Sequence, residues 1–184
     1  YHRLLGRGIG IVFLLPFLYF AIRGRIHNAQ LPKYIGMFVL GGLQGALGWY
    51  MVKSGLVDNP HVSPYRLTAH LALAFAIYGY MFCVALGLLS PRPQHQGGSA
   101  VRRLSLYSLG VTTLIFIMIL SGGFVAGLKA GLAFNTFPTM NGHWLPPGLY
   151  ALRPLWHNFF ENLATVQFNH RMLAYLLAVT IPLF

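Results

Sequence analysis

Three of the eight histidines in this chain lie where long apolar segments begin. His2 and His170 each open a segment, and His70 lies about two turns, or ~10 Å, after a Ser63-Pro64 pair typical of a helix start. An imidazole at such a depth in an apolar helix is costly unless it has a partner, a cavity or a metal. Because paired imidazoles from facing helices hold haem iron in apolar bundles, these positions predict haem binding.

Arginines accompany all three histidines. They are Arg3, Arg7, Arg66 and Arg171. Haem carries propionates, and a guanidinium binds a carboxylate through two parallel hydrogen bonds. One such histidine alone could equally make an interhelical hydrogen bond, but three of them with neighbouring arginines favour a shared ligand. Zinc is a weaker alternative because no carboxylate lies at these helix starts, and calcium and magnesium lack oxygen ligands here.

A short repeat relates the first and last apolar segments. His2-Arg3-Leu4-Leu5 opens the first, and His170-Arg171-Met172-Leu173 opens the last. Duplicated bundles show such internal similarity. His2 and His70 are 68 residues apart, so the partner of His170 is expected about as far beyond it, outside this sequence. The repeat therefore predicts two haem sites, one in each half.

Five long apolar segments must position these residues. They are residues 4–22, 34–52, 67–89, 104–126 and 166–184. Each has about the 20 residues that a helix needs to cross a membrane, where backbone groups must be paired internally. With 56% hydrophobic and 8% charged residues, the chain is predicted to be an all-α, polytopic transmembrane helical bundle. Small residues spaced by four, at Gly41 and Gly45 and at Gly123, Gly127 and Gly131, predict closely packed helices.

The charges and links give an expected orientation. Lys and Arg number 13 against two acidic residues, and they punctuate apolar runs instead of forming a polar face, which argues against nucleic-acid binding. The raw count of basic residues does not decide the orientation, but once the four arginines beside the histidines are set aside, six remain on one side against three on the other. This places the links after the first and third segments on the cytoplasmic or matrix side, and the three histidines opposite. Residues 129–165 are predicted to form an ordered loop at the membrane surface. Five other histidines are predicted to be solvated in links: His27, His61, His95, His143 and His157.

Several stretches resemble the haem A synthase family, in the form found in mitochondria and alpha-proteobacteria. They are residues 1–7, 41–56, 65–71, 124–138 and 161–171. The most specific is Trp49-Tyr50-Met51-Val52-Lys53-Ser54-Gly55-Leu56. The resemblance implies an eight-helix protein made of two four-helix halves, of which the five segments would be the second to sixth helices. One departure is Lys129, where many relatives have Asp.

The resemblance also implies an activity, the oxidation of the C8 methyl of haem O to the formyl of haem A for cytochrome oxidase. Residues 1–90 would form the substrate half, with His2 and His70 acting on haem O, and residues 104–184 the half that holds haem b on His170. The four arginines would bind the haem groups, and the acid-base residue would precede Tyr1. The implied setting is a mitochondrial inner or bacterial cytoplasmic membrane. Expected partners are an electron donor such as a ferredoxin, haem O synthase and oxidase assembly factors.

Two other classes of protein fit parts of the pattern. A dihaem cytochrome b that carries electrons would also use paired histidines, but it would place haems near both membrane faces, whereas these histidines favour one face. A transporter with inverted repeats would show helix breaks and polar groups near the midplane. The polar residues here gather at one end, which favours the haem enzyme.

Overall fold

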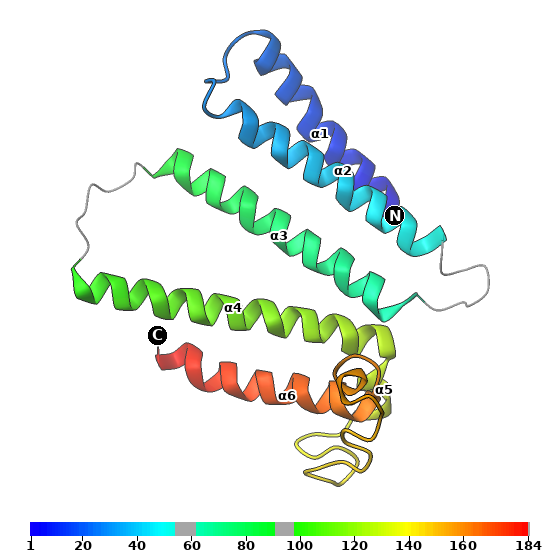
Figure 1. The fold of residues 1–184 in the computed structure, drawn as a ribbon. Coiled ribbons are helices and arrows are strands. Elements are labelled where there is room, and N and C mark those ends of the chain that lie inside the picture. Colours follow the sequence, from blue (N-terminus) through cyan, green and yellow to red (C-terminus); the bar gives the residue numbers. More distant parts are fainter. Residues whose placement is uncertain (54–61, 91–97, 184) are drawn as a thin grey trace. The chain divides into compact units, whose positions relative to one another are not determined.

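The computed structural model describes residues 1–53, 62–90 and 98–183, and every long element among them is a helix (Figure 1). The helices are α1 (His2–Ile22), α2 (Leu31–Lys53), α3 (Pro64–Leu89), α4 (Ser99–Leu128), α5 (Ala130–Ala133) and α6 (Leu163–Thr180), with the short 3-10 helices η1 (Leu155–Phe159) and η2 (Ile181–Leu183). The described part of the chain contains no strand. The predicted all-α class is confirmed.

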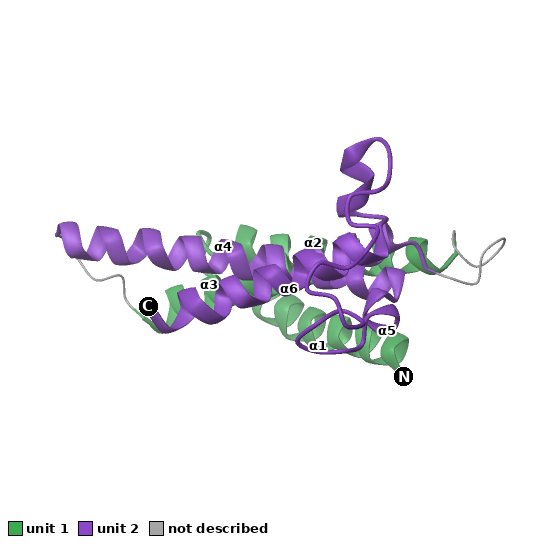
Figure 2. Ribbon diagram, turned by 90° about the horizontal axis from the view of Figure 1, so that it is seen from below, with its two compact units in different colours: residues 1–54, 73–93 green, residues 55–72, 94–184 purple. Residues whose placement is uncertain are grey.

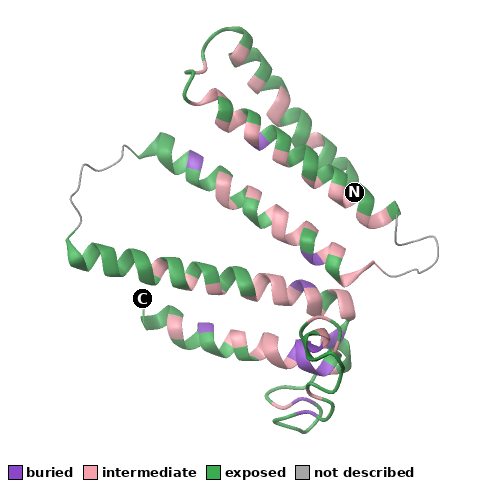
Figure 3. Cartoon of the chain, in the orientation of Figure 1, coloured by how far each residue is buried: buried purple, intermediate pink, exposed green. Residues whose placement is uncertain are grey.

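Four of these helices, α1 to α4, are long and apolar enough to cross a membrane, and the chain is an integral membrane protein. Most of their large apolar side chains are exposed in the isolated chain (Figure 3), as expected where lipid covers them. The fifth predicted segment forms α6, but this helix is only 18 residues long. Its first half is polar around Gln167 and Arg171, so its crossing of the membrane stays a prediction.

The chain separates into two compact units (Figure 2). Unit 1 consists of residues 1–54 and 73–93, and unit 2 of residues 55–72 and 94–184. The first turns of α3 therefore belong to unit 2 and its remainder to unit 1. The predicted halves, residues 1–90 and 104–184, stay a prediction.

Unit 1 is held together by aromatic side chains. Phe13 of α1 stacks on Phe38 of α2, with ring centroids 6.4 Å apart, and Phe17 lies the same distance from Tyr34. The α3 portion joins through Tyr80, whose hydroxyl donates a hydrogen bond of 3.3 Å to the Lys33 carbonyl at the start of α2. Such ring pairs stabilise a helix contact beyond the area that they bury.

In unit 2, glycines of α4 allow the first turns of α3 to approach closely. A Cβ atom at Gly123 would lie 2.7 Å from Thr68 Oγ1, and one at Gly127 would lie 2.6 Å from Pro64 Cα. The close packing predicted from the glycine spacing is confirmed at these two positions. It is wrong for Gly41 and Gly45 of α2, where an added Cβ would meet nothing within 4 Å in the described part of the chain. It is also wrong for Gly131, because α4 ends where Lys129 adopts a left-handed conformation, with φ 56°, and Gly131 lies in α5.

Between α5 and α6, residues 134–162 form an ordered loop, as predicted. Side-chain amides pair the backbone groups that no helix or sheet pairs in this loop. Asn158 is fully buried. Its amide accepts a hydrogen bond from Leu152 N and donates to the carbonyls of Leu152 and Leu155. Asn162 caps α6 by accepting a hydrogen bond of 3.1 Å from Thr165 N. Buried residues gather at this start of α6 (Figure 3), so the loop and α6 form the best-packed part of unit 2.

Replacing Gly127 with alanine tests the approach of α3 to α4. The new Cβ would lie 2.6 Å from Pro64 Cα, so the start of α3 must move, and we expect the free energy of unfolding to fall by about 1–3 kcal/mol. Thermal unfolding of the full-length protein in detergent measures the change. Gly110→Ala is the matched control, because a Cβ at this position of α4 meets open space and alanine favours a helix by about 1 kcal/mol. Equal midpoints for the two variants would contradict the packing.

Candidate functional site

His170 lies in the first half of α6 and faces α4. Its Nδ1 atom is 2.7 Å from the hydroxyl oxygen of Ser121. A Cβ atom on the next residue of α4, Gly122, would lie 3.2 Å from His170 Cε1, so the imidazole occupies space that a larger residue would take. Among the described residues, no hydrogen bond reaches His170 Nε2. The histidine is thus fixed through one nitrogen and presents the other.

Arg171, the next residue, holds the loop that follows α5. One terminal nitrogen of its guanidinium donates hydrogen bonds to the carbonyls of Phe134 (2.9 Å) and Thr136 (2.7 Å). The other donates to the carbonyls of Pro138 (3.4 Å) and Thr139 (3.2 Å). The four terminal N–H groups are therefore directed at backbone oxygens, and the Nε–H group is left for another acceptor. The predicted role of Arg171 in binding haem stays a prediction.

His70 and Arg66 lie in the first two turns of α3, within unit 2, and both are half-buried. Thr68, between them, packs against Gly123, while His170 packs against Gly122. Because these glycines are consecutive, α4 brings the starts of α3 and α6 to the same level. The structure therefore brings the chain segments that carry His70 and His170 together.

His2, Arg3 and Arg7 lie in the first two turns of α1, in unit 1, and all three side chains are exposed. Their spacing on the helix places them within about 8 Å along its axis. The pairing of His2 with His70 stays a prediction. So does the assignment of Arg3 and Arg7 to haem propionates.

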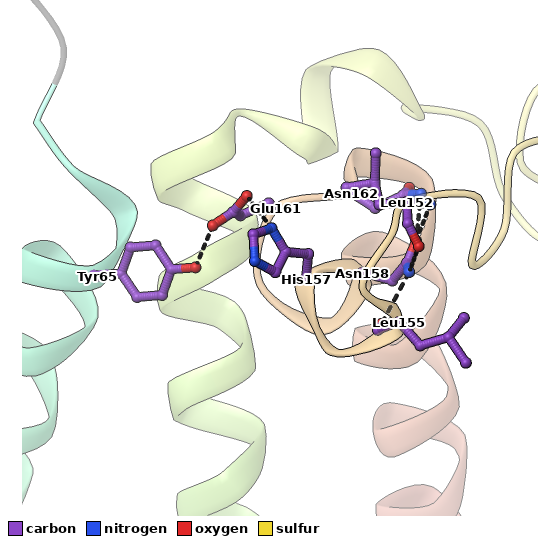
Figure 4. Close-up of polar contacts among 7 residues, drawn as sticks. All are labelled: Tyr65, Leu152, Leu155, His157, Asn158, Glu161 and Asn162. Atoms are coloured by element: carbon purple, nitrogen blue, oxygen red, sulfur yellow. Dashed lines mark hydrogen bonds and ion pairs between the residues drawn. The ribbon is translucent and has the colours of Figure 1, made fainter.

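A second polar cluster joins α3 to the loop (Figure 4). The hydroxyl of Tyr65 donates a hydrogen bond of 2.7 Å to Glu161 Oε1, and His157 Nδ1 lies 3.1 Å from Oε2 of the same carboxylate. The Tyr65 ring also packs edge-on against Phe124, with centroids 5.5 Å apart. His157 was predicted to be a solvated link histidine. It is partly exposed but has this specific partner.

Sequence reasoning missed Ser121 and Gly122 as neighbours of His170, and it missed the contact of Tyr65 with Glu161. The available signal for the first pair was a serine followed by two glycines in an otherwise apolar segment. The signal for the second was that Glu161 is one of only two carboxylates in a strongly basic chain. Two further predicted link histidines, His61 and His95, lie outside the described residues.

Haem iron needs only one or two imidazoles from the protein, whereas a metal ion held by side chains alone needs three or four of them. Across residues 1–53, 62–90 and 98–183, no three His, Cys, Asp or Glu side chains come together. His170, with one nitrogen anchored and its ring between two apolar helices, is an imidazole that would fit a haem iron.

Comparisons with known proteins give one consistent family. The model of the COX15-CtaA family, described as cytochrome oxidase assembly protein, matches residues 1–184. Proteins named heme A synthase from Nitrosospira multiformis and Nitrosomonas eutropha are 58% and 54% identical over the whole chain, which covers 52% of each of them. Heme A synthase COX15 of Arabidopsis thaliana is 47% identical over 94% of the chain and 40% of its own length. The chain spans about half the length of the curated relatives it matches, and no solved structure matches it.

Replacing Arg171 tests whether its guanidinium holds the loop. Arg171→Gln removes the four donated hydrogen bonds, and one such bond to a charged group contributes about 1.5–3 kcal/mol. We expect amide hydrogen exchange in residues 134–139 to accelerate by about tenfold or more, measured on the full-length protein by mass spectrometry. Arg171→Lys keeps the charge but lacks the planar set of guanidinium N–H donors, so it should protect the loop amides from exchange only partly. Arg103→Gln, at an exposed position of α4, is the control. Unchanged exchange in Arg171→Gln would show that the loop folds without this contact.

Proposed function

The chain belongs to the COX15-CtaA family of cytochrome oxidase assembly proteins, and from this premise we propose that it serves haem A synthesis. The reaction is the oxidation of the C8 methyl of haem O to a formyl group by successive hydroxylation. The family match along the whole chain supports this activity, as do the printed names of relatives up to 58% identical. The observation in the structure that supports it most directly is the anchored imidazole of His170, whose Nε2 is presented to a ligand.

His170 would hold a haem b in the C-terminal half, residues 104–184, through its imidazole. When bound there, haem b supplies one-electron redox chemistry. Three residues of the chain would fix the His170 imidazole and its surroundings. Ser121 holds the Nδ1 side of the imidazole, Gly122 leaves room for the ring, and Arg171 fixes the adjoining loop.

His2 and His70 are proposed to hold the substrate haem O in the N-terminal half, residues 1–90. Arg3, Arg7 and Arg66 stand within two turns of these histidines, where guanidinium groups would bind propionates in pairs of hydrogen bonds. Arg171 would bind a haem group through its Nε–H group, because its terminal N–H groups donate to the loop. The proposed division into two haem sites, one in each half, follows from the His-Arg pair that opens α1 and recurs in α6.

The reaction needs partners that this chain does not contain. The conversion of a methyl to a formyl group is a four-electron oxidation, so an oxidant such as dioxygen would be consumed together with electrons from a donor such as a ferredoxin. Haem O synthase would supply the substrate. Oxidase assembly factors would receive the product. A dihaem cytochrome b carrier would also use paired histidines and is the second candidate, but the names of the relatives favour the synthase.

Analysis of the haem groups decides between the two candidates. The full-length protein is expressed in cells that also make haem O, and the extracted haems are separated by chromatography and identified by mass. Haem A, or haem O hydroxylated at C8, is expected for a synthase. Haem b together with unaltered haem O would favour the electron carrier and contradict the proposal.

Substitutions at the two proposed histidine sites should have different effects on haem A formation and haem b binding in the full-length protein. His70→Ala is expected to abolish haem A formation while haem b remains bound, because the variant removes only a ligand of the substrate haem. His170→Ala is expected to lose haem b. His27→Ala is the control, since this histidine lies in a link and its Nδ1 accepts a hydrogen bond from Ala29 N. Continued haem A output from His70→Ala would remove His70 from the mechanism.

A further inference from the structure

We propose that Ser121 is a positioning residue that keeps the proton of the His170 imidazole on Nδ1, so that Nε2 is the metal-binding nitrogen. The inference rests on the proposed function, in which His170 binds haem b. It concerns a residue of α4 whose hydroxyl contacts the His170 imidazole and the Met118 carbonyl of the preceding turn. Its action is on the imidazole alone.

Two short contacts of one hydroxyl group carry the inference. Ser121 Oγ lies 2.7 Å from His170 Nδ1 and 2.9 Å from the carbonyl oxygen of Met118, one turn earlier in α4. A serine hydroxyl has a single proton and can donate only one of these hydrogen bonds. The Met118 carbonyl cannot donate, so its contact is a hydrogen bond only when Ser121 supplies the proton.

The other contact must then run in the opposite direction. With its proton directed at Met118, Ser121 Oγ accepts a hydrogen bond from His170 Nδ1–H. If Nδ1 instead lacked its proton, Ser121 would have to choose one acceptor. Two oxygen atoms would then face each other at 2.9 Å, or a nitrogen lone pair would face an oxygen lone pair at 2.7 Å. Both contacts are favourable together only in the Nδ1–H tautomer.

That tautomer leaves the Nε2 lone pair available for a metal. Histidine ligands commonly donate their second ring N–H to an oxygen acceptor, which fixes the ring orientation and makes the ligand more basic. The acceptor here is a neutral hydroxyl, already polarised by its own hydrogen bond to Met118. Gly122 leaves room for the ring next to Ser121, since a Cβ there would lie 3.2 Å from Cε1, the carbon between the two nitrogens.

The same helix supplies a matched control. Thr113 Oγ1 donates a hydrogen bond of 2.8 Å to the carbonyl of Leu109, so it makes the same kind of bond to a preceding turn of α4. Thr113 is not among the contacts of His170. A change that acts through the stability of α4 should therefore appear at both positions, whereas a change that acts through the imidazole should appear only at Ser121.

The test compares Ser121→Ala, Ser121→Thr, Ser121→Val and Thr113→Val in the full-length protein purified with its haem. The readouts are haem b content after washing, the midpoint potential of that haem and its low-spin electron paramagnetic resonance spectrum. We expect Ser121→Ala and Ser121→Val to weaken haem b binding by about 10–100-fold and to raise the potential, because a less basic ligand stabilises ferric iron less. Ser121→Thr should restore both, and Thr113→Val should match the parent protein.

The outcomes separate this inference from the function on which it rests. Normal haem b content and potential in both Ser121→Ala and Ser121→Val, with loss of haem b in His170→Ala, would overturn the role of Ser121 alone. Haem b retained in His170→Ala would overturn the proposed ligand and the inference with it. If Ser121→Ala fails to fold, the isosteric threonine and valine variants still differ by the hydroxyl. Equal spectra from those two would overturn the inference.

Discussion

The candidate site depends on the hydrogen bonds that the Arg171 guanidinium donates to the loop after α5. An irregular segment beside a membrane leaves backbone carbonyls without partners, and each must be satisfied by a donor other than a helix or sheet. Arg171 supplies four such donors to residues 134–139. Because consecutive helix residues point about 100° apart, the preceding residue, His170, faces α4 while Arg171 faces the loop. One turn of α6 thus fixes the imidazole and the loop together.

The loop reinforces this arrangement through buried amides. Asn158 binds three backbone groups, and Asn162 donates to it and also to the Gly148 carbonyl. The hydroxyl of Thr165, which is fully buried, accepts a hydrogen bond from Tyr150 N. Paired in this way, polar groups cost little to bury and define one conformation. The start of α6 is therefore rigid where the candidate ligand is carried.

The helices were predictable from sequence because apolar length determines them. The predicted and observed starts of α1, α2 and α3 differ by only two or three residues, as frayed or polar first turns allow. The partners of the site residues were not predictable. A hydroxyl side chain in an apolar segment looks the same in the sequence whether it bonds to a histidine, as Ser121 does, or only to its own helix, as Thr113 does. The partners of Arg171 are backbone carbonyls, which no pattern of side-chain types reveals. Gly131 was misassigned because a left-handed lysine ended α4 before it.

The carboxylate of Glu161 has a consequence for the order of assembly. It joins Tyr65, 96 positions earlier in the chain, to the neighbouring His157. Contacts between segments so distant in sequence form late, because the intervening chain must first be ordered. During synthesis, the hydrogen bond between Tyr65 and Glu161 can therefore form only after α4 and the loop up to Glu161 have been made.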